Sequence, residues 1–117
     1  MITNPDWVFT ELHFALNALS LDAQEALATQ SEDSSRPNEL ALGFGDALLA
    51  ALEYSQNFTA AQLAALNAVA ESLKTMSSDA DARLWTEAAV HIHPAWTRVR
   101  SLARNALREL GWHIDRI

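Results

Sequence analysis

Histidines are the first residues in this chain whose chemistry we consider. His91 and His93 are separated by one residue, and imidazole nitrogen is a common zinc ligand. A zinc site needs three or four ligands in a defined geometry, and the chain has no cysteine to complete one. His13 and His113 lie far from the pair in sequence. We therefore expect no metal and no cofactor, and a capping or surface role for His93, which precedes Pro94.

Arg108 and His113 form a second candidate for chemistry. The segment Arg108-Glu-Leu-Gly-Trp-His113 resembles the Arg-x(4)-His motif of the HEPN family, which are all-helical ribonucleases. The resemblance implies that Arg108 and His113 would meet near a dimer cleft and cleave RNA. Gly111 departs from the motif, because it should end a helix that the family keeps continuous. We keep this as the enzyme alternative. The chain has no Ser-His-Asp arrangement and no phosphate-binding loop, so we expect no catalytic residues.

Apolar side chains outside the expected core favour binding over catalysis. Trp7, Phe14 and Leu21 recur every seven residues on one side of the first predicted helix, and Leu42 and Leu49 do the same on the second. Carboxylates flank both rows. The candidate partner-binding residues are Trp7, Glu11, Phe14, Leu21, Glu25, Leu42, Asp46, Leu49 and Glu53. Apolar anchors ringed by acids would bind a basic partner. The alternative is a first helix that is buried on both sides or covered by the C-terminal tail.

Arginines on the last predicted helix form a basic row. Arg100, Arg104 and Arg108 recur every four residues, so they share one side of the helix. A phosphate track needs more aligned cations than these. We expect the row to contact acids of the first three helices within the fold or across a homodimer, or to face solvent.

Five helices are predicted to position these residues. They cover residues 5–29, 39–56, 59–76, 78–90 and 93–110, with a polar loop at about 31–38. A kink near Ser20 is the alternative for the first helix, because Ser20-Leu21-Asp22 can start a new one. Thr59 and Gln62 form a capping box, and Gly111 supplies a left-handed stop. The expected core contains Leu12, Leu16, Leu48, Leu52, Leu66, Leu73, Val99 and Leu102.

Composition sets the fold class. The 117 residues include 22 Ala and 17 Leu, but only four Val and four Ile. Ala and Leu are strong helix formers, whereas β-branched residues favour strands. We therefore predict a single all-α domain over residues 1–117, bundle-like or orthogonally packed.

The charge of the chain excludes some partners. The formal net charge is −7, and residues 1–81 carry 12 acids and two bases, a net −10, while residues 82–117 carry a net +3. Such an acidic protein repels bare nucleic acid and favours a cationic protein. We also expect no membrane contact and a cytoplasmic location, because no signal peptide or long apolar segment is evident and cysteine is absent.

The chain is small and acidic and has no cysteine, and its C-terminal third contains the segments Leu84-Trp85, Pro94-Ala-Trp96, Val99-Arg100 and Leu110-Gly-Trp112. In these features it resembles the all-helical immunity proteins of bacterial contact-dependent inhibition and other polymorphic toxin systems. The resemblance implies a protein that binds a cognate toxin, often a basic nuclease, and covers its active site. One alternative is a homo-oligomeric helical adaptor with a self-complementary apolar seam. Another is a phage-type mimic of nucleic acid, which would need denser carboxylates.

Overall fold

The computed structural model describes residues 6–32, 35–79 and 81–114. These residues form six α-helices and two short 3-10 helices and contain no strand, which confirms the all-α prediction. The α-helices are α1 (Asp6–Ser20), α2 (Ala23–Ala28), α3 (Arg36–Leu52), α4 (Ala60–Ser78), α5 (Glu87–Ile92) and α6 (Pro94–Leu110). The 3-10 helices are η1 (Ser55–Asn57) and η2 (Ala82–Trp85).

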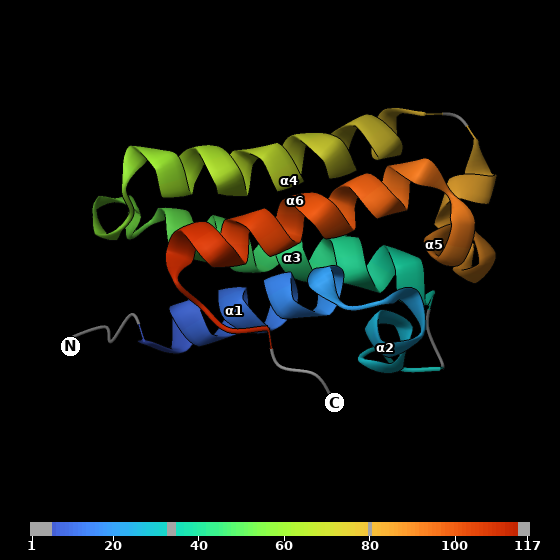
Figure 1. The fold of residues 1–117 in the computed structure, drawn as a ribbon, viewed down its shortest axis with the longest axis horizontal. Coiled ribbons are helices and arrows are strands. Elements are labelled where there is room, and N and C mark those ends of the chain that lie inside the picture. The colour runs from blue at the N-terminus through green and yellow to red at the C-terminus, as the bar shows by residue number, and fades with distance from the viewer. Residues whose placement is uncertain (1–5, 33–34, 80, 115–117) are drawn as a thin grey trace.

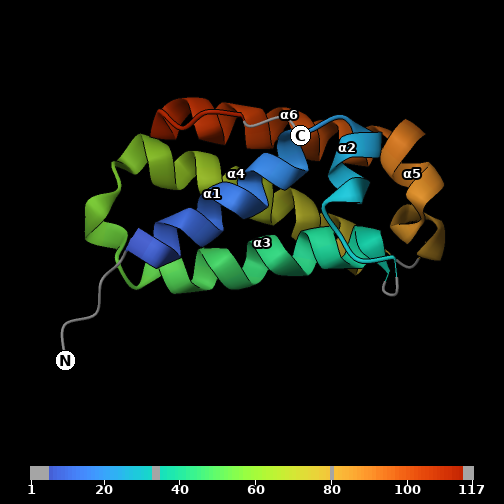
Figure 2. The same cartoon turned by 90° about the horizontal axis from the view of Figure 1, so that it is seen from below.

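The four long helices form a bundle, with α1 and α4 on opposite sides and α3 and α6 between them (Figures 1 and 2). The short helices α2 and α5 close one end of the bundle (Figure 1). Residues of all four long helices meet in one core, including Leu12, Phe44, Leu66 and Val99, each at most 1% exposed. Most of the expected core is confirmed. The prediction that Leu52 belongs to it is wrong, because Leu52 lies at the last turn of α3 and is 38% exposed.

The first predicted helix is broken at the kink proposed as its alternative. α1 ends at Ser20, and Asp22 occupies the N-cap position of α2. Two arginines of α6 bind the backbone at this corner: Arg104 Nε donates to the carbonyl of Ser20 at 2.7 Å, and Arg100 Nε donates to that of Leu21 at 3.1 Å. The carbonyls at the end of α1 thus find partners outside the helix.

The second helix is shifted relative to its prediction. α3 begins at Arg36, so the polar loop predicted over 31–38 ends earlier, at Ser35. Pro37 fits the first turn of α3, because that turn needs no backbone N–H from it. α3 ends at Leu52 instead of residue 56, and the chain continues through the 3-10 turn Ser55–Asn57.

The helix predicted over 78–90 is wrong at its start. Ser78 ends α4, and its hydroxyl donates to the carbonyl of Lys74 four residues earlier at 3.0 Å. Two short helices follow in place of one. The Asp81 side chain caps η2, and the Thr86 hydroxyl caps α5 by accepting from the N–H of Ala89 at 3.1 Å.

Three predictions about the ends of helices are confirmed. Thr59 and Gln62 form the capping box at the start of α4, with bonds of 3.1 and 2.8 Å. His93 caps α6, because its Nδ1 accepts from the N–H of Ala95 at 3.0 Å. Gly111 ends α6 with a φ of 72°, in the left-handed region.

Candidate functional site

Four of the predicted apolar anchors lie on the surface of α1 and α3. Trp7 and Phe14 of α1 are 58% and 59% exposed, and Leu42 and Leu49 of α3 are 59% and 69% exposed. On both helices these residues point away from the side that packs into the core. Water therefore reaches two aromatic and two leucine side chains on neighbouring helices.

Two residues predicted to bind the partner, Leu21 and Glu25, do not lie with the exposed row of α1. Leu21 is 2% exposed, because α1 ends one residue before it and the chain turns its side chain into the core. The prediction that Leu21 continues the exposed row is therefore wrong. Glu25 is half-buried on α2, after the turn, so the seven-residue spacing no longer aligns it with Glu11.

The outer side of α3 alternates acids with leucines. Glu39, Leu42, Asp46, Leu49 and Glu53 follow one another at spacings of three and four residues, and all five are exposed. The sequence interpretation missed Glu39, which the same spacing could have identified. We define the α1–α3 face as Trp7, Glu11, Phe14, Glu39, Leu42, Asp46, Leu49 and Glu53.

A cleft opens between the two helices of this face. α1 and α3 lie side by side and diverge toward α2 (Figure 2). The cleft holds about 140 Å³ and is lined by Glu11, Phe14, Ala15, Ala18, Gln30, Glu39, Leu40 and Gly43. It brings Glu11 and Phe14 from the first helix together with Glu39 from the other. We call it the α1–α3 cleft.

The ion pairs of residues 6–32, 35–79 and 81–114 lie outside the α1–α3 face. They join Arg36 to Glu87 at 2.9 Å, Arg83 to Asp81 at 2.9 Å, and Arg104 to Asp22 at 3.1 Å. Hydrogen bonds from Arg83 hold the pKa of Asp81 below its usual value. Within these residues, the acids of the face therefore have no cation to neutralise them.

Two of the three arginines in the row on α6 donate hydrogen bonds to other parts of the molecule. Arg104 Nε donates to the carbonyl of Ser20, and Arg100 donates to two carbonyls, from Nε to Leu21 and from Nη2 to Val90, each at 3.1 Å. Burial lowers the pKa of Arg100 below its ordinary value, and the nearby charge of Arg104 lowers it further. Arg108 is exposed. An intramolecular role is confirmed for both Arg100 and Arg104. The predicted contact with an acid is confirmed only for Arg104, which binds Asp22 at 3.1 Å, whereas the described partners of Arg100 are backbone carbonyls.

The C-terminal tail packs on a different side of α1 from the exposed row. His13 Nε2 and the carbonyl oxygen of His113 are 2.6 Å apart, and the rings of His13 and Trp112 have centroids 5.2 Å apart. His13 lies about 100° around the helix from Phe14. The tail, as far as residue 114, thus leaves Trp7 and Phe14 exposed.

The two residues of the ribonuclease alternative border one hollow. Arg108 lies in the last turn of α6, and His113 follows the left-handed stop at Gly111. Together with Trp112 they line a hollow of about 410 Å³. Among the described residues, no group of three or more His, Asp or Glu side chains is placed to hold a metal ion.

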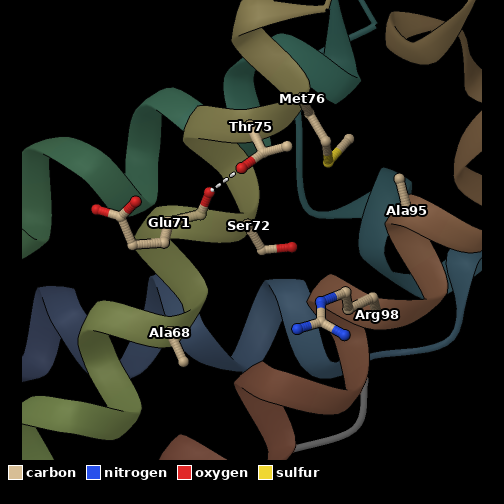
Figure 3. A pocket seen from close by; sticks show the side chains of 7 residues that line it. All are labelled: Ala68, Glu71, Ser72, Thr75, Met76, Ala95 and Arg98. Carbon is tan, nitrogen blue, oxygen red and sulfur yellow. Dashed lines mark hydrogen bonds between the residues drawn. The ribbon is translucent and has the colours of Figure 1, made fainter.

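A hollow of about 440 Å³ lies between α4 and α6 (Figure 3). Arg98 extends over it toward Ser72, whereas the carboxylate of Glu71 points away from Arg98 (Figure 3). The hydroxyl of Thr75 donates within α4 to the carbonyl of Glu71 at 2.9 Å. Met76 also lines the hollow. The hollow thus combines one cation, Arg98, with apolar residues such as Met76.

Comparison of the chain with protein-family models, with curated proteins and with solved structures finds no match. Across the described part of the chain, no helix has both the length and the apolar character needed to cross a bilayer.

Proposed function

We propose that this protein is an immunity-type inhibitor that binds a cationic partner, a bacterial toxin domain, through the α1–α3 face. One observation carries the proposal: exposed anchors such as Trp7 and Leu49 lie on two neighbouring helices, α1 and α3, together with acids that form no ion pair among the described residues. Tight interfaces combine desolvated anchors with complementary charge, which speeds encounter and rejects wrong partners.

The location of the charges supports a basic partner. Arg100 and Arg104 donate to backbone carbonyls and to Asp22, so these cations do not offset the acids of the face. A nuclease domain is a suitable target, because a site that binds polyanionic nucleic acid is itself basic. An acidic face bound over that site would exclude the substrate.

The same charges disfavour the homodimer alternative. In a twofold dimer, a surface patch meets its own copy. The outer side of α3 would then place the carboxylates of Glu39, Asp46 and Glu53 against the same three carboxylates of the other copy, and such like-charge contacts weaken association. We expect the purified protein to be a monomer in light scattering, and a stable dimer through this face would favour the adaptor.

Binding to the protein encoded immediately upstream tests the proposal. The purified C-terminal domain of that protein is titrated with this chain in biolayer interferometry, and growth protection is scored in cells that express both. We expect Trp7→Ala and Leu49→Ala each to weaken binding by about 2 kcal/mol, roughly 30-fold. Ile92→Ala is the matched control, because Ile92 is 80% exposed on α5, outside the face.

Charge reversal provides a second test with its own control. Asp46→Lys should slow association and flatten its salt dependence, because the acid steers the cationic partner. Glu71→Lys makes the same change in net charge on α4, outside the face, and should have a smaller effect. Absence of binding and of growth protection, or equal effects of the paired variants, would refute the proposal.

The HEPN-like ribonuclease is the second candidate, since Arg108 and His113 line one hollow. Its motif needs both side chains on a continuous helix, whereas α6 ends at Leu110, before His113. We therefore rank it below the binding function.

A further inference from the structure

The α1–α3 cleft has the size of a side-chain site. Its volume of about 140 Å³ is well below the roughly 300–1,000 Å³ of most small-molecule pockets. It opens within the surface proposed to bind the partner, between Phe14 and Glu39. We therefore ask which side chain of a partner protein it suits.

Besides Phe14, the apolar part of the cleft lining consists of three small residues and one leucine. Ala15 and Ala18 of α1 face Leu40 and Gly43 of α3. A Cβ atom added at Gly43 would meet no other atom within 4 Å, so the missing side chain leaves open space. Such a lining can remove a hydrocarbon stem from water.

The rim of the cleft offers hydrogen-bond acceptors. Glu11 and Glu39 contribute carboxylates from two helices, and neither forms an ion pair within the described residues. The Nε2 of Gln30 donates to Thr29 Oγ1 at 2.8 Å, which leaves the amide oxygen of Gln30 as a third acceptor. Among the described residues, the lining contains no cationic side chain. A ligand for this rim must be a donor with positive charge.

We propose that the α1–α3 cleft binds an arginine side chain of the partner protein. The proposal rests on the proposed function and names the group that the partner inserts. A guanidinium presents five N–H donors in a plane, which suits acceptors arriving from Glu11, Glu39 and Gln30. It also stacks on aromatic rings, and Phe14 stands at the rim. The arginine methylenes cover the apolar part of the lining.

An NMR titration tests the cleft without the partner. The ¹⁵N-labelled protein is titrated with N-acetyl-arginine-N-methylamide, and the backbone amide of Gly43 and the side-chain amide of Gln30 are followed. We expect saturable shifts at both, with a Kd on the order of millimolar for a single side chain. The citrulline analogue has a similar shape without the charge and should bind at least about tenfold more weakly.

Two glycines of α3 provide a matched pair of variants. Gly43→Leu fills the cleft, whereas Gly45→Leu adds the same side chain about 200° around the helix. At both positions an added Cβ meets nothing within 4 Å, so both variants should fold, as circular dichroism will check. We expect Gly43→Leu to weaken arginine binding at least about tenfold and Gly45→Leu to stay within about twofold of wild type.

Removal of charge separates the cleft from the rest of the acidic surface. Glu11→Gln combined with Glu39→Gln should abolish the saturable shifts, whereas Asp46→Asn combined with Glu53→Gln removes two charges elsewhere and should retain them. Equal binding of the citrulline or lysine analogue would overturn the assignment to arginine. Shifts spread evenly over all acidic positions, or an unchanged affinity in Gly43→Leu, would overturn the site.

Partner binding distinguishes failure of this inference from failure of the proposed function. If Trp7→Ala weakens binding to the upstream toxin domain while Gly43→Leu binds at full strength, the face is correct and the arginine site is wrong. If Gly43→Leu and Trp7→Ala both weaken binding and Gly45→Leu does not, both proposals are supported.

Discussion

Leucine-to-alanine substitutions at Leu21 and at Leu49 test the assignment of the α1–α3 face. Both leucines were predicted from the sequence to lie in the binding set, but Leu21 is 2% exposed and Leu49 is 69% exposed. Leu21→Ala removes three buried carbon atoms, at about 0.8 kcal/mol each. The cavity left behind adds to this loss, so we expect the free energy of unfolding to fall by about 3 kcal/mol, within the usual range of roughly 2–5.

Leu49→Ala removes the same atoms from a side chain that is mostly in water. Less than a third of its surface is buried, so about 0.7 kcal/mol of transfer free energy is lost. The gap opens to solvent and leaves no cavity. Alanine is also a slightly better helix former than leucine, which offsets part of the loss. We expect a net change of about 0.5 kcal/mol or less.

Urea unfolding, followed by far-ultraviolet circular dichroism and by tryptophan fluorescence, measures both changes. Equal slopes with urea in wild type and variants would show that the same surface is exposed on unfolding. A loss of more than about 2 kcal/mol for Leu49→Ala, or of less than about 1 for Leu21→Ala, would refute the assigned exposures. In the first case the face would lack Leu49 as an anchor, and in the second Leu21 would not be buried as assigned.

Three further predictions follow from local contacts. Thr59→Ala should destabilise the fold by about 1 kcal/mol in thermal unfolding, because the capping box of α4 is lost, whereas Thr59→Ser should retain most of the stability. Arg83→Gln should raise the pKa of Asp81 toward its ordinary value in an NMR titration; in wild type the pair is lost as pH falls through that depressed pKa, and an unchanged midpoint would contradict the assigned cause. Purified protein should leave RNA uncleaved, and cleavage abolished by Arg108→Ala or His113→Ala would instead support the ribonuclease.

Much of the fold was predictable because its signals are local. The capping box at Thr59 and the left-handed Gly111 act through atoms a few residues away, so the sequence carries them directly. The apolar periodicity of α1 likewise fixes which side is buried, as Leu12 and Leu16 show at 0% exposure. These signals define where a helix begins and which side faces inward.

The error in the first predicted helix occurs where distant groups decide the local structure. The corner at Ser20 and Leu21 is bound by arginines 84 and 79 residues away, and no pattern near residue 20 contains them. The sequence therefore offered a continuous helix and a kink as alternatives. Leu21 was placed in the exposed row because the seven-residue spacing holds only if the helix continues.

In the candidate site, too, the features set by one helix were predicted and those set by several elements were not. Trp7, Phe14, Leu42 and Leu49 were found as rows opposite the core, which is a property of one helix at a time. The α1–α3 cleft requires the packing of two helices and the loop residue Gln30, so periodicity within one helix could not locate it. Single-helix patterns find a face, whereas tertiary contacts shape its cleft.

The arginines of α6 connect the charge of the chain with the geometry of the face. The end of a helix carries a partial negative charge on its free carbonyls, and Arg100 and Arg104 bind this end of α1. The net +3 of residues 82–117 is therefore partly used to hold α1 against α6. Because Arg100 and Arg104 donate at the corner of Ser20 and Leu21, they are not paired with the acids of the face. One pair of arginines thus both binds the end of α1 and leaves unneutralised the negative charge of the face that, in our proposal, attracts a basic partner.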